Sequence, residues 1–140
     1  MPRWRLMAGR PVVELEFARR ADGERVLRRM VADTGAGRTL SPFHLILKQS
    51  DVREFLLFND RFSVRLGGAL MGTHPCSWVV GGVRGLPLGP LVAVAVPDGD
   101  PAFRRIQKDG AEGIAGMRFL DGFSYGNFGF QGEFGIEPLS

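Results

Sequence analysis

The chain has 140 residues, enough for one domain, and its 44% hydrophobic and 24% charged residues are typical of a globular protein. Its net charge of +3 is too small to indicate a nucleic-acid-binding protein, since acids alternate with the arginines around residues 19–29 and no aromatic side chain lies there to stack a base. A lone cysteine, Cys76, excludes a disulfide between these residues and a cysteine-based metal site.

The first third of the chain predicts a hairpin followed by a helix. Residues 12–18 (VVELEFA) alternate apolar and polar side chains, as a half-buried strand does. An Asp-Gly turn then leads into a second strand, residues 26–32 (VLRRMVA), which ends directly before Asp33. Ser41 and Pro42 have the pattern of a helix N-cap and first helical position, so we expect residues 43–48 (FHLILK) to form a short helix.

The rest of the chain predicts further strands and a second helix. The expected segments, in chain order, are apolar stretches at 53–58 and 62–66, a glycine-rich loop at 67–75, strands at 77–83 and 90–96, a helix from Asp100-Pro101 to Gly110, a strand with a helical turn at 113–120, and a closing hairpin at 125–139. No repeat or linker interrupts them. The sequence therefore predicts a mainly β domain with two or three short helices.

Patterns of several other kinds of site are absent from the sequence. His44, expected on the first helix, and His74 lack cysteine or carboxylate partners at metal-ligand spacing, which favours a structural role for His44. No serine lies in a G-x-S-x-G turn, and the glycine-rich stretches lack the Lys and Ser/Thr of a phosphate-binding loop. We therefore expect neither a metal ion nor an organic cofactor.

The tripeptide Asp33-Thr34-Gly35 has two interpretations. Aspartate often closes a turn by accepting hydrogen bonds from nearby backbone N–H groups, and such a turn needs no function. Here, however, the carboxylate follows an apolar strand and is followed by Gly35, Ala36 and Gly37, which leave space for the backbone of a ligand to approach. The second interpretation is a catalytic carboxylate.

The stretch MVADTGA resembles the first signature of the retropepsin-like aspartic peptidases, the retroviral proteases and their bacterial and cellular relatives. Ile114-Ala115-Gly116 resembles their second signature, two apolar residues and a glycine before a helical turn. RTLSPFHL is similar to the continuation found in bacterial relatives. The resemblance implies that residues 1–140 form a single retropepsin-like domain, a closed β-barrel of the acid-protease type with one lobe per chain and short helices.

The resemblance also implies a homodimeric aspartic endopeptidase. Asp33 and the partner's Asp33 would activate a water molecule, because one chain holds a single such motif and the reaction needs two carboxylates. Two carboxylates about 3 Å apart cannot both ionise, so one would act as base and the other as acid. Thr34 would hydrogen-bond across the two-fold axis, and Gly35 and Ala36 would support the loop. The partners would be a second copy and a peptide or protein substrate, without nucleic acid or membrane.

A flap must cover such a site, and two glycine-rich segments compete for this role. We prefer residues 67–75, with Leu70, Met71, Gly72 and Thr73 at the tip, because this segment has the glycines and the apolar tip of a mobile hairpin. The segment after residues 79–85, LPLGPLVAVAV, is similar to the strand-turn-strand that comes after the flap in bacterial relatives. Residues 79–85 (VVGGVRG) are the alternative, since they are more similar to the viral flap sequence.

Two departures from the family leave a second function open. Gly37 and Arg38 stand where viral members carry carboxylates, and Met117 stands where they often carry the arginine that pairs with one of them. The alternative is a catalytically silent dimer of the same fold that binds peptides or serves in assembly.

By resemblance to viral members, we expect the terminal segments PRWRLM and IEPLS to form part of the dimer interface. The chain has neither an apolar run long enough to cross a membrane nor the apolar core of a signal peptide at its start, so the expected compartment is the cytoplasm.

Overall fold

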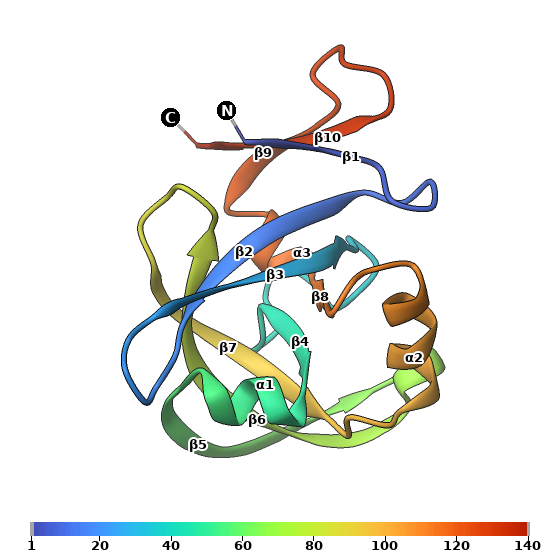
Figure 1. Ribbon diagram of the computed structural model, residues 1–140. Helices are drawn as coiled ribbons and strands as arrows, with labels where there is room; N and C mark the ends of the chain where they lie inside the picture. The colour runs from blue at the N-terminus through green and yellow to red at the C-terminus, as the bar shows by residue number, and fades with distance from the viewer. Residues whose placement is uncertain (1, 140) are drawn as a thin grey trace.

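A computed structural model describes residues 2–139, except for the side chains of residues 59–61 (Figure 1). Its elements, in chain order, are β1 (Arg3–Arg5), β2 (Val12–Ala18), β3 (Arg25–Ala32), β4 (Leu45–Lys48), α1 (Gln49–Glu54), β5 (Leu56–Leu66), the 3-10 turn η1 (Gly68–Leu70), β6 (Gly72–Val83), β7 (Gly89–Val96), α2 (Pro101–Lys108), β8 (Gly113–Ala115), α3 (Met117–Leu120), β9 (Phe123–Gly126) and β10 (Glu133–Pro138). The predicted mainly β fold with a few short helices is confirmed. Within residues 2–139, no helix has the length and apolar character that crossing a membrane requires.

The first hairpin forms as the sequence predicts. Strands β2 and β3 pair in antiparallel register, with Val13 opposite Met30. Val13, Leu15 and Phe17 are fully buried, because the alternating pattern places all three on the face that meets the core. Asp22 stabilises the turn by accepting the Glu24 N–H at 2.9 Å.

The predicted helix over residues 43–48 is wrong, because Leu45–Lys48 form the strand β4 and His44 directly precedes it. Leu45 and Leu47 lie in one core cluster and Ile46 lies in the other, so both faces of the strand are buried. A short apolar run can form either a buried strand or a buried helix, and here the neighbouring strands β7 and β8 decide between them. Ser41 caps no helix; its hydroxyl accepts the Arg38 N–H at 2.7 Å within the preceding loop.

Most later elements follow their predictions, but residues 72–75 of the expected glycine-rich loop belong to β6, and α1 was not expected. Helix α2 begins after Asp100, whose side chain accepts the Ala102 N–H at 2.9 Å, and Gly110 follows its end with a φ of +96°. Residues 113–120 form strand β8 and then α3, and β9 and β10 form the closing hairpin.

Six strands of the part of the chain that the structure describes form a ring. Their order is β2-β3-β8-β4-β7-β6, an additional pairing of β2 with β6 joins the ends, and β5 extends the sheet beyond β6. Strand β8 lies between β3 and β4 and is parallel to β3. One core cluster contains Phe17, Leu45 and Leu120, and the other lies beneath α2, whose Phe103 and Ile106 are buried.

The terminal segments lie side by side in the same chain. Strand β1 pairs with β10, and β10 with β9, in a separate three-stranded sheet at the top of Figure 1. Within PRWRLM, Arg3–Arg5 pair with residues 133–135 of β10, directly before IEPLS, and the Ile136 N–H donates to the Pro2 carbonyl at 3.0 Å. Ser140 of IEPLS lies outside the described residues. The expected role of both segments between two copies stays a prediction.

A buried ion pair joins the first hairpin to α1. Asp51 is 2% exposed and accepts two hydrogen bonds from Arg28, at 3.1 Å from Nε and 3.2 Å from Nη2. Burial alone would lower the pKa of Arg28, but the bonds to Asp51 and the charges of Asp51, Glu112 and Glu54 raise it above its ordinary value. The pair ties α1 to β3.

Replacing Asp51 by alanine is expected to lower the free energy of unfolding by about 3 kcal/mol, because a partly buried guanidinium loses its bidentate partner. The control is Glu24→Ala, since Glu24 bonds to Arg19 at 3.3 Å but is 72% exposed. That change should cost less than about 1 kcal/mol. Urea denaturation of both variants provides the comparison, and equal costs would contradict a special role for the Arg28–Asp51 pair.

Candidate functional site

Asp33 stands where strand β3 ends and a loop begins. Its backbone N–H donates to the carbonyl of Ala115 at 2.9 Å, so the parallel pairing of β3 with β8 extends to the aspartate itself. Its Oδ1 accepts the Gly35 N–H at 2.8 Å, and its backbone carbonyl accepts the Ala36 N–H at 3.1 Å. The carboxylate therefore closes the turn, and Oδ2 has no hydrogen-bond partner among the described residues.

The second motif lies directly against this loop, although Gly116 follows Asp33 by 83 positions. The Met117 N–H donates to the Ala36 carbonyl at 2.9 Å, and the Gly116 N–H donates to the His44 carbonyl at 2.9 Å. A Cβ added to Gly116 would stand 2.6 Å from the Ala36 oxygen, so only glycine permits this approach. The insertion of β8 between β3 and β4 is what brings the two motifs together.

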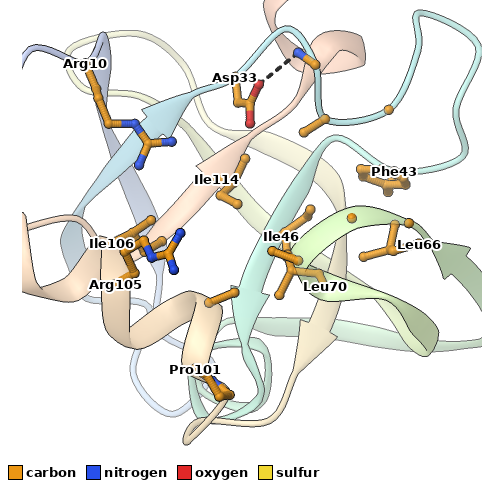
Figure 2. Close-up of a pocket in the computed structure, with 17 residues that line it drawn as sticks. Arg10, Asp33, Phe43, Ile46, Leu66, Leu70, Pro101, Arg105, Ile106 and Ile114 are labelled. Carbon is orange, nitrogen blue, oxygen red and sulfur yellow. Dashed lines mark hydrogen bonds between the residues drawn. The ribbon is translucent and has the colours of Figure 1, made fainter.

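Asp33 opens onto a cavity of about 880 Å³. Figure 2 shows its carboxylate directed toward an apolar wall that contains Ile46, Ile114 and Leu70. The cavity is lined by Arg10, Asp33, Gly35, Ala36, Gly37, Phe43, Ile46, Leu66, Gly67, Gly68, Ala69, Leu70, Pro101, Ala102, Arg105, Ile106 and Ile114.

The preferred flap segment forms the turn between β5 and β6, and part of it borders the cavity. Residues 67–70 line the cavity opposite the Asp33 loop, and Leu70 is 9% exposed with its side chain in the core cluster beneath α2. Met71 is 78% exposed and lies outside the lining, as do Gly72 and Thr73, which begin β6. Of the four tip residues, only Leu70 therefore lines the cavity onto which Asp33 opens.

The alternative flap segment, residues 79–85, lies elsewhere. Gly81, Gly82 and Val83 pair with β2 and border a second cavity of about 460 Å³, whose lining does not include Asp33. Gly81 is held close to Phe17, since an added Cβ would stand 2.7 Å from its ring. This segment is therefore part of the ring of strands.

Some of the other site residues named from the sequence line the cavity, and others lie beneath or outside it. Gly35, Ala36 and Ile114 line the cavity; Ala115 and Gly116 are buried beneath the loop; Thr34 is exposed and outside the lining. Sequence reasoning missed Arg10 and Arg105, which also line the cavity. Neither belongs to a recognisable motif, and α2 was identified only as a helix.

His44 has a structural role in the support of the site. Its backbone N–H donates to the Val92 carbonyl at 2.9 Å, and its ring Nδ1 accepts the Val92 N–H at 3.1 Å. An accepting Nδ1 requires the neutral ring with the proton on Nε2. Burial, followed by the charge of Arg118, lowers the pKa of His44 to about 4. In the described residues, no three His, Cys, Asp or Glu side chains gather as a metal-ion site.

This lowered pKa predicts a loss of stability in mild acid. The unfolded chain takes up the His44 proton near pH 6.5 and the folded chain only near pH 4, so the unfolded state binds more protons between these values. The free energy of unfolding should therefore fall by about 2 to 3 kcal/mol as the pH drops through this range.

The measurement is urea denaturation of wild type and His44→Asn at several pH values. Asparagine keeps an acceptor for the Val92 N–H but cannot take up a proton in this range. The wild type should lose more stability than the variant between pH 6.5 and 5, where most carboxylates remain ionised. Parallel pH profiles would show that His44 is not responsible.

Comparisons of the chain with protein-family models, with curated proteins and with solved structures found no match. A functional assignment therefore depends on the sequence motifs and on the geometry around Asp33.

Proposed function

We propose that the chain is one half of a homodimeric aspartic endopeptidase with a retropepsin-like fold. The observation that carries the proposal is Asp33: a carboxylate at the junction of two motif loops, with one oxygen held by Gly35 and the other directed into a cavity. An aspartic peptidase needs such a carboxylate to accept a proton from water beside the scissile carbonyl.

A second copy is needed because the cavity supplies one carboxylate. Among the described residues that line it, Asp33 is the only acid. A two-fold axis beside the loop would bring the partner's Asp33 to the same water, with one carboxyl protonated to polarise the carbonyl. Thr34, Gly35 and Leu40 are exposed on this loop, and Leu40 is 94% exposed, which suits a surface that a second copy covers.

The substrate is an extended peptide segment. It lies between the Asp33 loop and the turn at residues 67–70, where the apolar wall accepts side chains next to the cleaved bond. Movement of that turn would admit the peptide and then exclude water from the reaction.

The test is the dependence of cleavage on assembly. Dimer content is measured by analytical ultracentrifugation, and cleavage of a peptide library is measured by mass spectrometry at the same concentrations. Once most of the protein is monomeric, each ten-fold dilution should lower cleavage per chain about ten-fold. Full activity of a strictly monomeric sample would contradict the proposal.

Mixing subunits provides a sharper form of this test. Wild-type chains are mixed with an equal amount of Asp33→Asn chains and allowed to exchange. If both carboxylates are needed, only wild-type homodimers cleave, and about one quarter of the activity of the same total amount of wild type remains. Independent monomers would keep about one half.

A further inference from the structure

Two arginine side chains extend into the cavity beside Asp33. Arg10 comes from the turn between β1 and β2, and Arg105 comes from α2; Figure 2 shows both guanidinium groups directed toward the space below Asp33. Among the described residues, neither guanidinium has a hydrogen-bond or ion-pair partner. Six other arginines form ion pairs with acids, namely Arg3, Arg19, Arg25, Arg28, Arg29 and Arg84, whereas Arg104, for example, forms none with a described acid.

Packing between the turn and the helix places both arginines on one wall. Met7 and Arg10 exchange two backbone hydrogen bonds of 2.9 Å, which fixes the turn. The Met7 sulfur packs against Gly110, just after α2, where an added Cβ would stand 3.1 Å from it. Ile106 anchors the helix in the core, and Arg105, although exposed, lines the cavity.

No acid in the described lining of the cavity forms an ion pair with Arg10 or Arg105. Its other lining side chains are apolar, among them Phe43, Ile46 and Ile114, and Asp33 is the only acid that the described residues contribute. Asp33 forms no ion pair with either arginine within 4.0 Å, so its charge is not used to neutralise them. An unpaired guanidinium in a partly enclosed cleft binds a carboxylate by charge-assisted, bidentate hydrogen bonds.

We propose that the cavity selects peptides with an Asp or Glu side chain within two residues of an apolar residue at the cleaved bond. Arg105 and Arg10 bind the carboxylate, and the wall around Ile46, Ile106 and Ile114 takes the apolar side chain. In an extended peptide, alternate side chains point to the same face about 7 Å apart, so one bound strand can present both groups to this wall. The cleavage step rests on the proposed peptidase function; the binding preference does not.

The experiment measures binding with Asp33→Asn protein, which is expected to fold but not to cleave. The probes are fluorescent eight-residue peptides with capped ends and a central Phe-Leu pair, carrying Glu, Gln or Lys two residues before it. At low salt, the Glu peptide should bind about ten-fold more tightly than the Gln peptide, and this ratio should shrink as salt is added. A Gln peptide with a free C-terminal carboxylate tests whether a chain end is bound instead.

Variants of the arginines provide matched controls. Arg105→Gln and Arg10→Gln should each reduce the preference for Glu over Gln to about two- or three-fold, and Arg105→Glu should shift it toward the Lys peptide. Arg104→Gln should leave the preference unchanged, because Arg104 lies on the same helix and is exposed, as Arg105 is, but does not line the cavity.

The inference would be overturned if the Glu and Gln peptides bound equally tightly, or if no peptide bound. It would also be overturned if Arg104→Gln lowered the preference for Glu as much as Arg105→Gln does, or if the free C-terminal carboxylate alone raised the affinity. The two proposals also fail separately. If the protein binds the Glu peptide preferentially but the wild type does not cleave it, the peptidase proposal is wrong and the proposed selective binding site stands. If the wild type cleaves the Glu and Gln peptides equally well, the peptidase proposal stands and the proposed selectivity is wrong.

Discussion

Asp33→Asn is expected to lower peptide cleavage by about a thousand-fold or more, because neither subunit then has a base that can accept a proton from water. The fold should remain. The amide oxygen of asparagine can still accept the Gly35 N–H that Oδ1 accepts at 2.8 Å, so the turn keeps its closing hydrogen bond. The free energy of unfolding should therefore change by less than about 1 kcal/mol, and it should rise if two crowded carboxylates repel each other in the dimer.

The measurement pairs cleavage rates with urea denaturation midpoints near neutral pH. Asp121→Asn is the control, since Asp121 is also an aspartate at a turn but is exposed and does not line the cavity. It should retain wild-type cleavage. An Asp33→Asn protein that is clearly destabilised and still cleaves would mean that Asp33 only closes a turn, and the peptidase proposal would then be wrong.

Gly116→Ala is expected to have the second large effect, on stability and on the site together. The added Cβ would stand 2.6 Å from the Ala36 oxygen, an atom of the backbone that cannot rotate away. The Met117 N–H holds that same oxygen at 2.9 Å, so the whole loop after Asp33 must shift. The φ of Gly116 is −87°, which any residue can adopt, so this contact and not the backbone conformation is the cause.

We expect a loss of about 2 to 3 kcal/mol in the free energy of unfolding. Cleavage per folded molecule should fall about ten-fold or more, because the shifted loop misplaces the carboxylate. Gly89→Ala is the control, since a Cβ there would meet no atom within 4 Å. Thermal denaturation and cleavage assays of both variants test the two effects. If Gly116→Ala matched Gly89→Ala in stability, the close contact between the loops would not be important.

The resemblance to retropepsin-like peptidases named both Asp33 and Gly116. The contact itself could not be deduced from either motif. It depends on β8, a strand of three residues, which enters between β3 and β4 and joins β3 in parallel. Parallel neighbours are joined by long connections, so their pairing leaves no signal in the nearby sequence.

Local sequence determined those elements whose patterns depend on nearby residues alone. The alternation in residues 12–18 specified a strand with one buried face, and Asp100-Pro101 specified the start of α2 through a cap that spans two residues. Only the tertiary structure decided that residues 45–48 are a strand, because both of their faces are covered by segments distant in sequence. In the same way, Arg10 and Arg105 are 95 positions apart, and they share a wall because Met7 packs against the end of α2. A pattern within one segment reports which of its faces is buried, whereas a site on this cavity depends on which segments meet there.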